Sequence, residues 1–156
     1  MELYESKVGK VVFARLSGGE DLLESITQLA DRAGVSAGFF FLIGTLEKAN
    51  LGFFREGKYV TKEMVVPLEI ASCSGNISIK EGKVFAHAHV VVSDERGNAF
   101  GGHVMPGCLV GITSELVLVE AKGINMLRRF DQKTKLFLLS VEKPRSKMKE
   151  KRSTSI

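Results

Sequence analysis

The spacing of hydrophobic residues changes along the chain, and this change separates one helix from a series of strands. Between Glu20 and Ala33, apolar residues recur at intervals of three and four positions, as on the buried face of an amphipathic helix. Glu20 and Asp21 suit the positive end of the helix dipole, and Gly34 can form the C-cap. The pattern therefore predicts a helix, whose buried face would be Leu22, Leu23, Ile26, Leu29, Ala30 and Ala33.

The other apolar segments are short, rich in β-branched residues and bounded by glycine-containing turns, which indicates strands. The unbroken run Ala37–Gly44 predicts a strand buried on both faces, and Gly75 predicts a bulge or a close approach of two backbones. We expect an α+β fold: a single compact domain with a largely antiparallel or mixed sheet and one main helix packed on it. The predicted strands are Lys10–Leu16, Ala37–Gly44, Leu46–Phe54, Tyr59–Val65, Leu68–Ile79, Val84–Ser93, Ile112–Ala121 and, after a turn at residues 131–133, Thr134–Val141.

All three histidines of the chain lie in one predicted hairpin. His87 and His89 are two residues apart in a strand, so they share one face. Residues 94–97, Asp-Glu-Arg-Gly, are typical of a type I turn with Gly97 in the left-handed conformation. Counting back from this turn places His89 opposite His103, with Cβ atoms roughly 5 Å apart.

The same count pairs Val92 with Phe100, although a bulge at residues 101–102 would shift the pairing by one position. The sequence thus predicts three imidazoles on one face of the hairpin. The residues expected to be buried behind them are Ala88, Val90, Val92, Phe100 and Val104.

Three neutral imidazoles can hold Zn²⁺ and leave the fourth coordination position open to water, as in catalytic zinc sites. We therefore predict that His87, His89 and His103 are metal ligands and that the metal is zinc. The alternative is that these histidines line a polar surface or a subunit contact as ordinary hydrogen-bonding groups.

Glu69 and Glu115 each lie in an otherwise apolar strand, where an unpaired carboxylate would be costly. Either could be a fourth metal ligand, a general base or a support for a ligand, or it could point to solvent. Glu115 is the better catalytic candidate because it follows the hairpin closely. No nucleophile-elbow motif occurs, so nucleophilic catalysis has no support.

The net charge of +4 is unevenly distributed. From Lys143 onward six Lys and Arg stand against one acidic residue, whereas residues 1–142 are close to neutral. We expect a domain at residues 1–142 and a basic, flexible tail at 143–156 that could contact DNA phosphates without sequence preference. No apolar run approaches the roughly 18 residues of a membrane span and no signal peptide is evident, so we expect a soluble cytoplasmic protein.

The two cysteines, Cys73 and Cys108, lack C-x-x-C spacing. The simpler interpretation is that they are small buried thiols in a reducing compartment, although the sequence leaves a disulfide open.

Four motifs, in the same order, resemble those of the PPC (plant and prokaryote conserved) domain. The resemblance covers about residues 7–142 and implies a compact α+β domain that forms a homotrimer. Histidines at the positions of His87, His89 and His103 are similar to those of metal-binding prokaryotic members, and the wider fold resembles that of a zinc-dependent acetolactate decarboxylase. The motifs are EIASCSGN at 69–76, GKVFAHAHVVVSD at 82–94, GNAFGGHV at 97–104 and TSELVL at 113–118.

Plant members of this family carry the domain beside DNA-binding AT-hooks, and stand-alone prokaryotic members are described as DNA-binding by association. This chain lacks the Arg-Gly-Arg core of an AT-hook, so that mode of DNA binding does not transfer. Our first hypothesis is a zinc-binding homotrimer that acts as a DNA-associated or regulatory interaction module rather than as an enzyme. The second is a zinc-dependent lyase or hydrolase that polarises a small carboxylate or carbonyl substrate with the help of Glu115 or Glu69.

Overall fold

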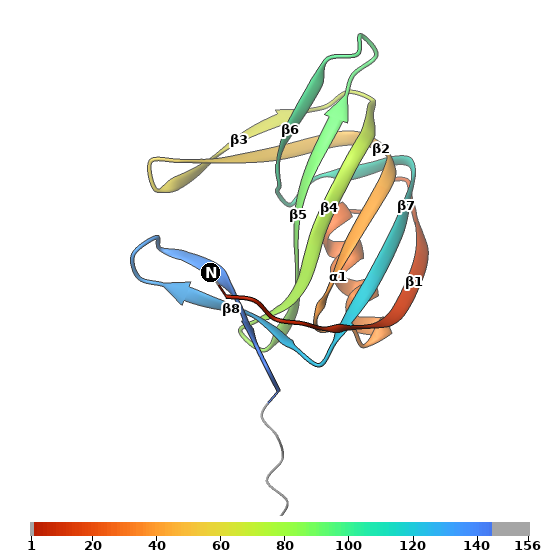
Figure 1. Ribbon diagram of the computed structural model, residues 1–156. Helices are drawn as coiled ribbons and strands as arrows, with labels where there is room; N and C mark the ends of the chain where they lie inside the picture. Colours follow the sequence, from red (N-terminus) through yellow and green to blue (C-terminus); the bar gives the residue numbers. More distant parts are fainter. Residues whose placement is uncertain (1, 145–156) are drawn as a thin grey trace, which may run out of the picture.

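The computed structural model describes residues 2–144 and contains one helix and one nine-stranded sheet (Figure 1). The chain is mostly β-sheet with one short helix in a single compact domain, so the predicted α+β class is confirmed in part. The elements are β1 (Lys7–Ser17), α1 (Leu22–Ala33), β2 (Gly38–Arg55), β3 (Lys58–Met64), β4 (Leu68–Lys80), β5 (Lys83–Ser93), β6 (Ala99–Val104), β7 (Leu109–Lys122), β8 (Asn125–Asp131) and β9 (Leu136–Glu142).

Helix α1 begins after Asp21, which acts as its N-cap: the Asp21 carboxylate accepts a hydrogen bond from the backbone N–H of Glu24 at 3.0 Å. It ends at Gly34, whose left-handed backbone forms the predicted C-cap. Leu22, Ile26 and Ala30 are fully buried. The predicted helix is therefore confirmed, and it lies against one face of the sheet, in contact with β5, β1 and β7.

Strand β2 merges two of the predicted strands into one of 18 residues, with register shifts near Gly44. Its first half pairs with β7 and β4, and its second half pairs with β3 and, through two residues, with β6. Because β4 pairs with β5 and β5 with β6, these pairings close a ring of four strands, β2, β4, β5 and β6. Every pairing is antiparallel except a short parallel contact between β4 and β8.

The prediction that the run 37–44 is buried on both faces was wrong. Phe40 and Leu42 lie in the core under the helix, but the alternate residues Phe39, Phe41 and Ile43 are exposed on the opposite face of the sheet. An unbroken apolar run cannot distinguish a covered face from an apolar face that is open to solvent. We call the exposed set the outer apolar face; its members are Val11, Phe13, Phe39, Phe41 and Ile43.

Cross-strand pairing connects the outer apolar face with the histidine hairpin. One row of directly opposed residues runs across six strands, and opposed residues point to the same side of a sheet. The row therefore passes from an apolar half into a polar half on one continuous surface. Its members in order are Phe13, Val117, Phe41, Ser74, His89 and His103.

Strand β8 was not predicted. It pairs with β9 along its whole length and with β4 only at residues 127–128. The two hairpins β2–β3 and β8–β9 project from the same side of the sheet (Figure 1). The predicted basic tail, 143–156, lies outside the described residues except for its first two positions. Within residues 2–144 no helix is long and apolar enough to cross a membrane.

Candidate metal centre

The turn of the β5–β6 hairpin has the predicted geometry. The backbone N–H of Gly97 donates to the carbonyl of Asp94 at 3.0 Å, and Gly97 has φ = 78°. The Asp94 carboxylate accepts hydrogen bonds from the backbone N–H groups of Arg96 and Asn98 and from the Asn98 side chain, at 2.9–3.0 Å. These bonds lower the pKa of Asp94 and fix the register of the hairpin.

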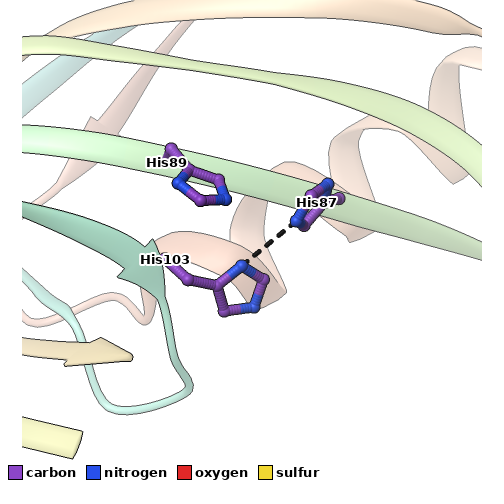
Figure 2. Close-up of side chains that lie close together, drawn as sticks. All are labelled: His87, His89 and His103. Carbon is purple, nitrogen blue, oxygen red and sulfur yellow. Dashed lines mark hydrogen bonds between the residues drawn. The ribbon is translucent and has the colours of Figure 1, made fainter. Parts of the chain in front are cut away.

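The register brings the three histidines together as predicted. His89 lies directly opposite His103 and Val92 opposite Phe100, and the pairing is continuous through residues 101–102, so the bulge that would have shifted it is absent there. The ring centroids are 4.8–5.3 Å apart, and one nitrogen from each ring lies within 4.8 Å of the others. Figure 2 shows His87 and His89 projecting from β5 toward His103 of β6.

The hairpin also has the predicted buried side. Ala88, Val90, Val92 and Val104 are fully buried, while Phe100 is only partly buried. The expectation for Phe100 therefore holds in part, because this residue lies near the turn of the hairpin, where the Lys62 ammonium is 4.6 Å from the centre of its ring.

Two of the imidazoles already interact. The Nε2 atom of His87 and the Nδ1 atom of His103 are 3.1 Å apart, which is a hydrogen bond if one ring donates and the other accepts. Burial lowers the pKa of His87 to about 4, and the charges of Arg128, His103 and His89 add to this effect. Burial also lowers the pKa of His103. Both rings are thus neutral near pH 7, the state in which imidazole binds metals.

This arrangement fits a metal ion with imidazole ligands. In a tetrahedral site with Zn–N bonds of about 2.0–2.1 Å, ligand nitrogens lie about 3.3 Å apart. The His87–His103 separation of 3.1 Å is close to that value, and the exposed ring of His89 can rotate toward the pair. Among the described residues this is the one cluster of at least three potential metal-ligating side chains. Three ligands would leave a fourth position open.

Glu69 and Glu115 do not belong to this cluster. Glu69 lies at the start of β4, opposite Ser93, seven residues from Asn76, which is the residue opposite His87. Glu115 is in β7, opposite Ile43 of β2, and β4 lies between β2 and the histidine strand β5. Both side chains are exposed, as the solvent-facing interpretation anticipated.

Two further residues border the histidines, and the sequence analysis identified neither. The Tyr59 ring of β3 lies 5.0 Å from the His103 ring. Arg128 of β8 donates a hydrogen bond to Asn76. No local motif marks either residue, because both reach the site through the folding of distant hairpins.

Cys73 and Cys108 are free and fully buried, as predicted for small buried thiols. Burial raises the pKa of Cys73 to about 12 and also raises that of Cys108. The Cys108 thiol donates to the carbonyl of Asn50 at 3.3 Å. Both thiols act as small core residues.

Solved structures similar to this chain cover nearly all of it. A protein from Archaeoglobus fulgidus described as metal-containing has 34% sequence identity and a TM-score of 0.82, covering 90% of this chain and 99% of its own. A plant- and prokaryote-conserved (PPC) protein from Pyrococcus horikoshii has 31% identity and a TM-score of 0.83, covering 92% and 100%. A proposed DNA-binding protein from Ralstonia eutropha has 28% identity and a TM-score of 0.72, covering 85% and 90%.

Two curated relatives are much longer than this chain, which matches only a part of each. The bifunctional protein GlmU of a Synechococcus strain is 33% identical over 135 residues, which are 85% of this chain but only 20% of that protein. The chain therefore spans about a fifth of the length of the curated relatives it matches. The Plants and Prokaryotes Conserved (PCC) domain, the family called PPC above, matches residues 4–122. The family match and the similar folds agree, and the chain belongs to the PCC domain family.

Proposed function

We propose that the protein is a PPC-domain interaction module that binds one zinc ion through His87, His89 and His103 and assembles as a homotrimer with a regulatory or DNA-associated role. The observation that carries the proposal is the convergence of three imidazoles on one face of a hairpin whose opposite face is fixed in the core. The metal-containing relative from Archaeoglobus fulgidus supports a metal, and three imidazoles with an open position suit zinc.

Metal analysis tests the zinc site. Freshly purified, unchelated protein should contain about one zinc per chain by mass spectrometry of the elements, and His87→Ala or His103→Ala should remove it. Ser74→Ala is a matched control, because Ser74 lies opposite His89 on the same exposed face but has no imidazole. Less than one transition metal per chain in the wild type would count against the site, and a metal other than zinc would correct its identity.

The outer apolar face supports self-association. Phe13 is 76% exposed and Phe41 is 48% exposed, and apolar patches of this kind mark protein contacts. Light scattering should give three times the 17.1 kDa of one chain. Phe41→Lys should shift the mass toward that of one chain, whereas Phe130→Lys, an exposed aromatic on the β8–β9 hairpin, should not. A wild-type monomer would refute the assembly.

DNA association is supported by the description of the Ralstonia eutropha relative and by the basic residues from position 143 onward. A duplex-binding assay over a range of salt concentrations should compare the full chain with residues 1–142. Loss of binding on truncation would assign it to non-specific tail electrostatics. Absence of binding by both forms would eliminate DNA as a partner and leave a regulatory contact with protein. The occurrence of a similar segment within the much longer bifunctional protein GlmU supports such a modular role.

A zinc-dependent lyase or hydrolase is the second candidate, favoured by the open metal position that three ligands would leave. Glu69 and Glu115 of the same chain lie away from the histidines, so another group would have to act as the acid or base of such a reaction. Water or a small carboxylate or carbonyl compound could occupy the open position.

A further inference from the structure

Arg128 reaches across the sheet to the side on which the histidines lie. Its Nη2 atom donates to the Asn76 side-chain oxygen at 2.7 Å and its Nε atom to the Ser78 hydroxyl at 3.2 Å. Asn76 is directly opposite His87 in the β4–β5 pair, so the two side chains point to the same side. The guanidinium carbon also lies 5.7 Å from the ring centroid of Phe85, two residues before His87. Arg128 is therefore fixed beside the histidine cluster.

The charge of Arg128 has no acidic partner among residues 2–144. The ion pairs within those residues are Lys48–Glu63, Arg55–Glu56 and Arg129–Glu142. Both hydrogen-bond acceptors of Arg128 are neutral, and the side chain is half-buried, which lowers its pKa. A partly desolvated cation without a counter-ion is costly, and a metal dication beside it would increase the cost. An anion bound between Arg128 and the metal would compensate both charges and so remove this electrostatic cost.

The surroundings fit a small planar anion. The bonds made by Nε and Nη2 hold Arg128 in place beside the site, and guanidinium groups bind carboxylates through charge-assisted hydrogen bonds. Tyr59 borders the cluster on the side of β3, with its ring 5.0 Å from that of His103. Phosphate sites commonly use a helix N-terminus, but α1 lies on the other face of the sheet.

We propose that the histidine site takes a small carboxylate, held with one oxygen on the metal and the other on the guanidinium of Arg128. This inference rests on the proposed metal site and gives its open position a ligand class. Arg128 lies beyond residues 4–122, which match the family, so the β8–β9 hairpin supplies the specificity.

The test uses the full chain loaded with Co²⁺, whose visible absorption reports on the ligands of the metal. At constant ionic strength and pH 7, acetate should change the spectrum of the wild type in a saturable way. The Arg128→Gln variant should still bind Co²⁺. Half-saturation of the spectral change should require at least about tenfold more acetate, because one charge-assisted contact is lost. Arg129→Gln is the matched control, since its neighbouring guanidinium pairs with Glu142 on the surface. That variant should behave as the wild type.

Arg128→Lys serves as a second variant, because it keeps the charge that anchors β8 while it removes the fork; it should also weaken acetate binding. Cobalt binding with no acetate response, or equal acetate affinity in Arg128→Gln and wild type, would overturn the carboxylate site and leave the metal site standing. Tighter binding of inorganic phosphate than of acetate would overturn the ligand class. Failure of the wild type to bind Co²⁺ would overturn the metal site and this inference with it.

Discussion

Gly75 should be the most sensitive small residue next to the histidine hairpin. It lies in β4 opposite Ala88, between the partners of His87 and His89. A Cβ atom added at Gly75 would stand 2.1 Å from the backbone oxygen of His87 and 2.4 Å from the Phe40 ring. Neither neighbour can yield easily, because one is backbone and Phe40 is only 1% exposed. Gly75→Ala therefore forces two strands apart at the level of the site.

Gly75→Ala should lower the free energy of unfolding by about 3 kcal/mol, the upper end of the range for overpacking a core. For a chain of this size that lowers Tm by about 6–12 °C, measured by calorimetry at one protein concentration. Metal affinity should fall as well, because the displaced atom belongs to the backbone of His87.

Gly101→Ala is the matched control on the same hairpin. The nearest atom to its added Cβ is 3.2 Å away and the residue is exposed, so the cost should be below about 1 kcal/mol. In a double-mutant cycle, Phe40→Leu should relieve part of the Gly75→Ala penalty, with a coupling of about 1 kcal/mol or more. Equal stability losses for the two glycine variants, or an absence of coupling, would refute the packing argument.

Three further predictions follow from the same structure. Asp94→Ala should lower Tm at pH 7; since the pKa of Asp94 is depressed, the difference from wild type should shrink as the pH falls below about 4, and a pH-independent difference would contradict this. Cys73 and Cys108 should not react with a thiol reagent at pH 8 until denaturant is added, and rapid native labelling would disprove their burial. Asp21→Ala should cost about 1–2 kcal/mol in denaturant unfolding, because the carboxylate caps α1 and also accepts from the backbone N–H of Gly107; Asp21→Asn should retain much of that stability.

The histidine hairpin was predictable because its determinants are local. Alternation fixes which residues share a face, and the Asp94–Gly97 turn fixes the register, so the pairing of His89 with His103 follows from counting. The close approach at Gly75 was also predictable in kind, although only the structure shows that Phe40 is the neighbour.

The surroundings of the hairpin were not predictable. Arg128 lies in a strand that was missed, and it reaches Asn76 only because β8 runs beside β4 for two residues, a contact between segments far apart in the sequence. Glu115 was a catalytic candidate because it is a carboxylate in an apolar strand. The sheet has an exposed face, however, on which a carboxylate is solvated and costs little free energy. Sequence pattern shows the two faces of a strand but does not show what covers each of them.

The row of opposed residues from Phe13 to His103 places the proposed association surface next to the proposed metal site, so that binding at one would affect binding at the other. Phe41 and His89 are separated by two strand spacings, about 10 Å, on one surface. A partner that covers Phe41 changes the solvent and the dielectric around His89. If the protein binds a metal and self-associates as proposed, the two equilibria are reciprocal: whatever factor association would contribute to metal affinity, the metal would contribute to the association constant.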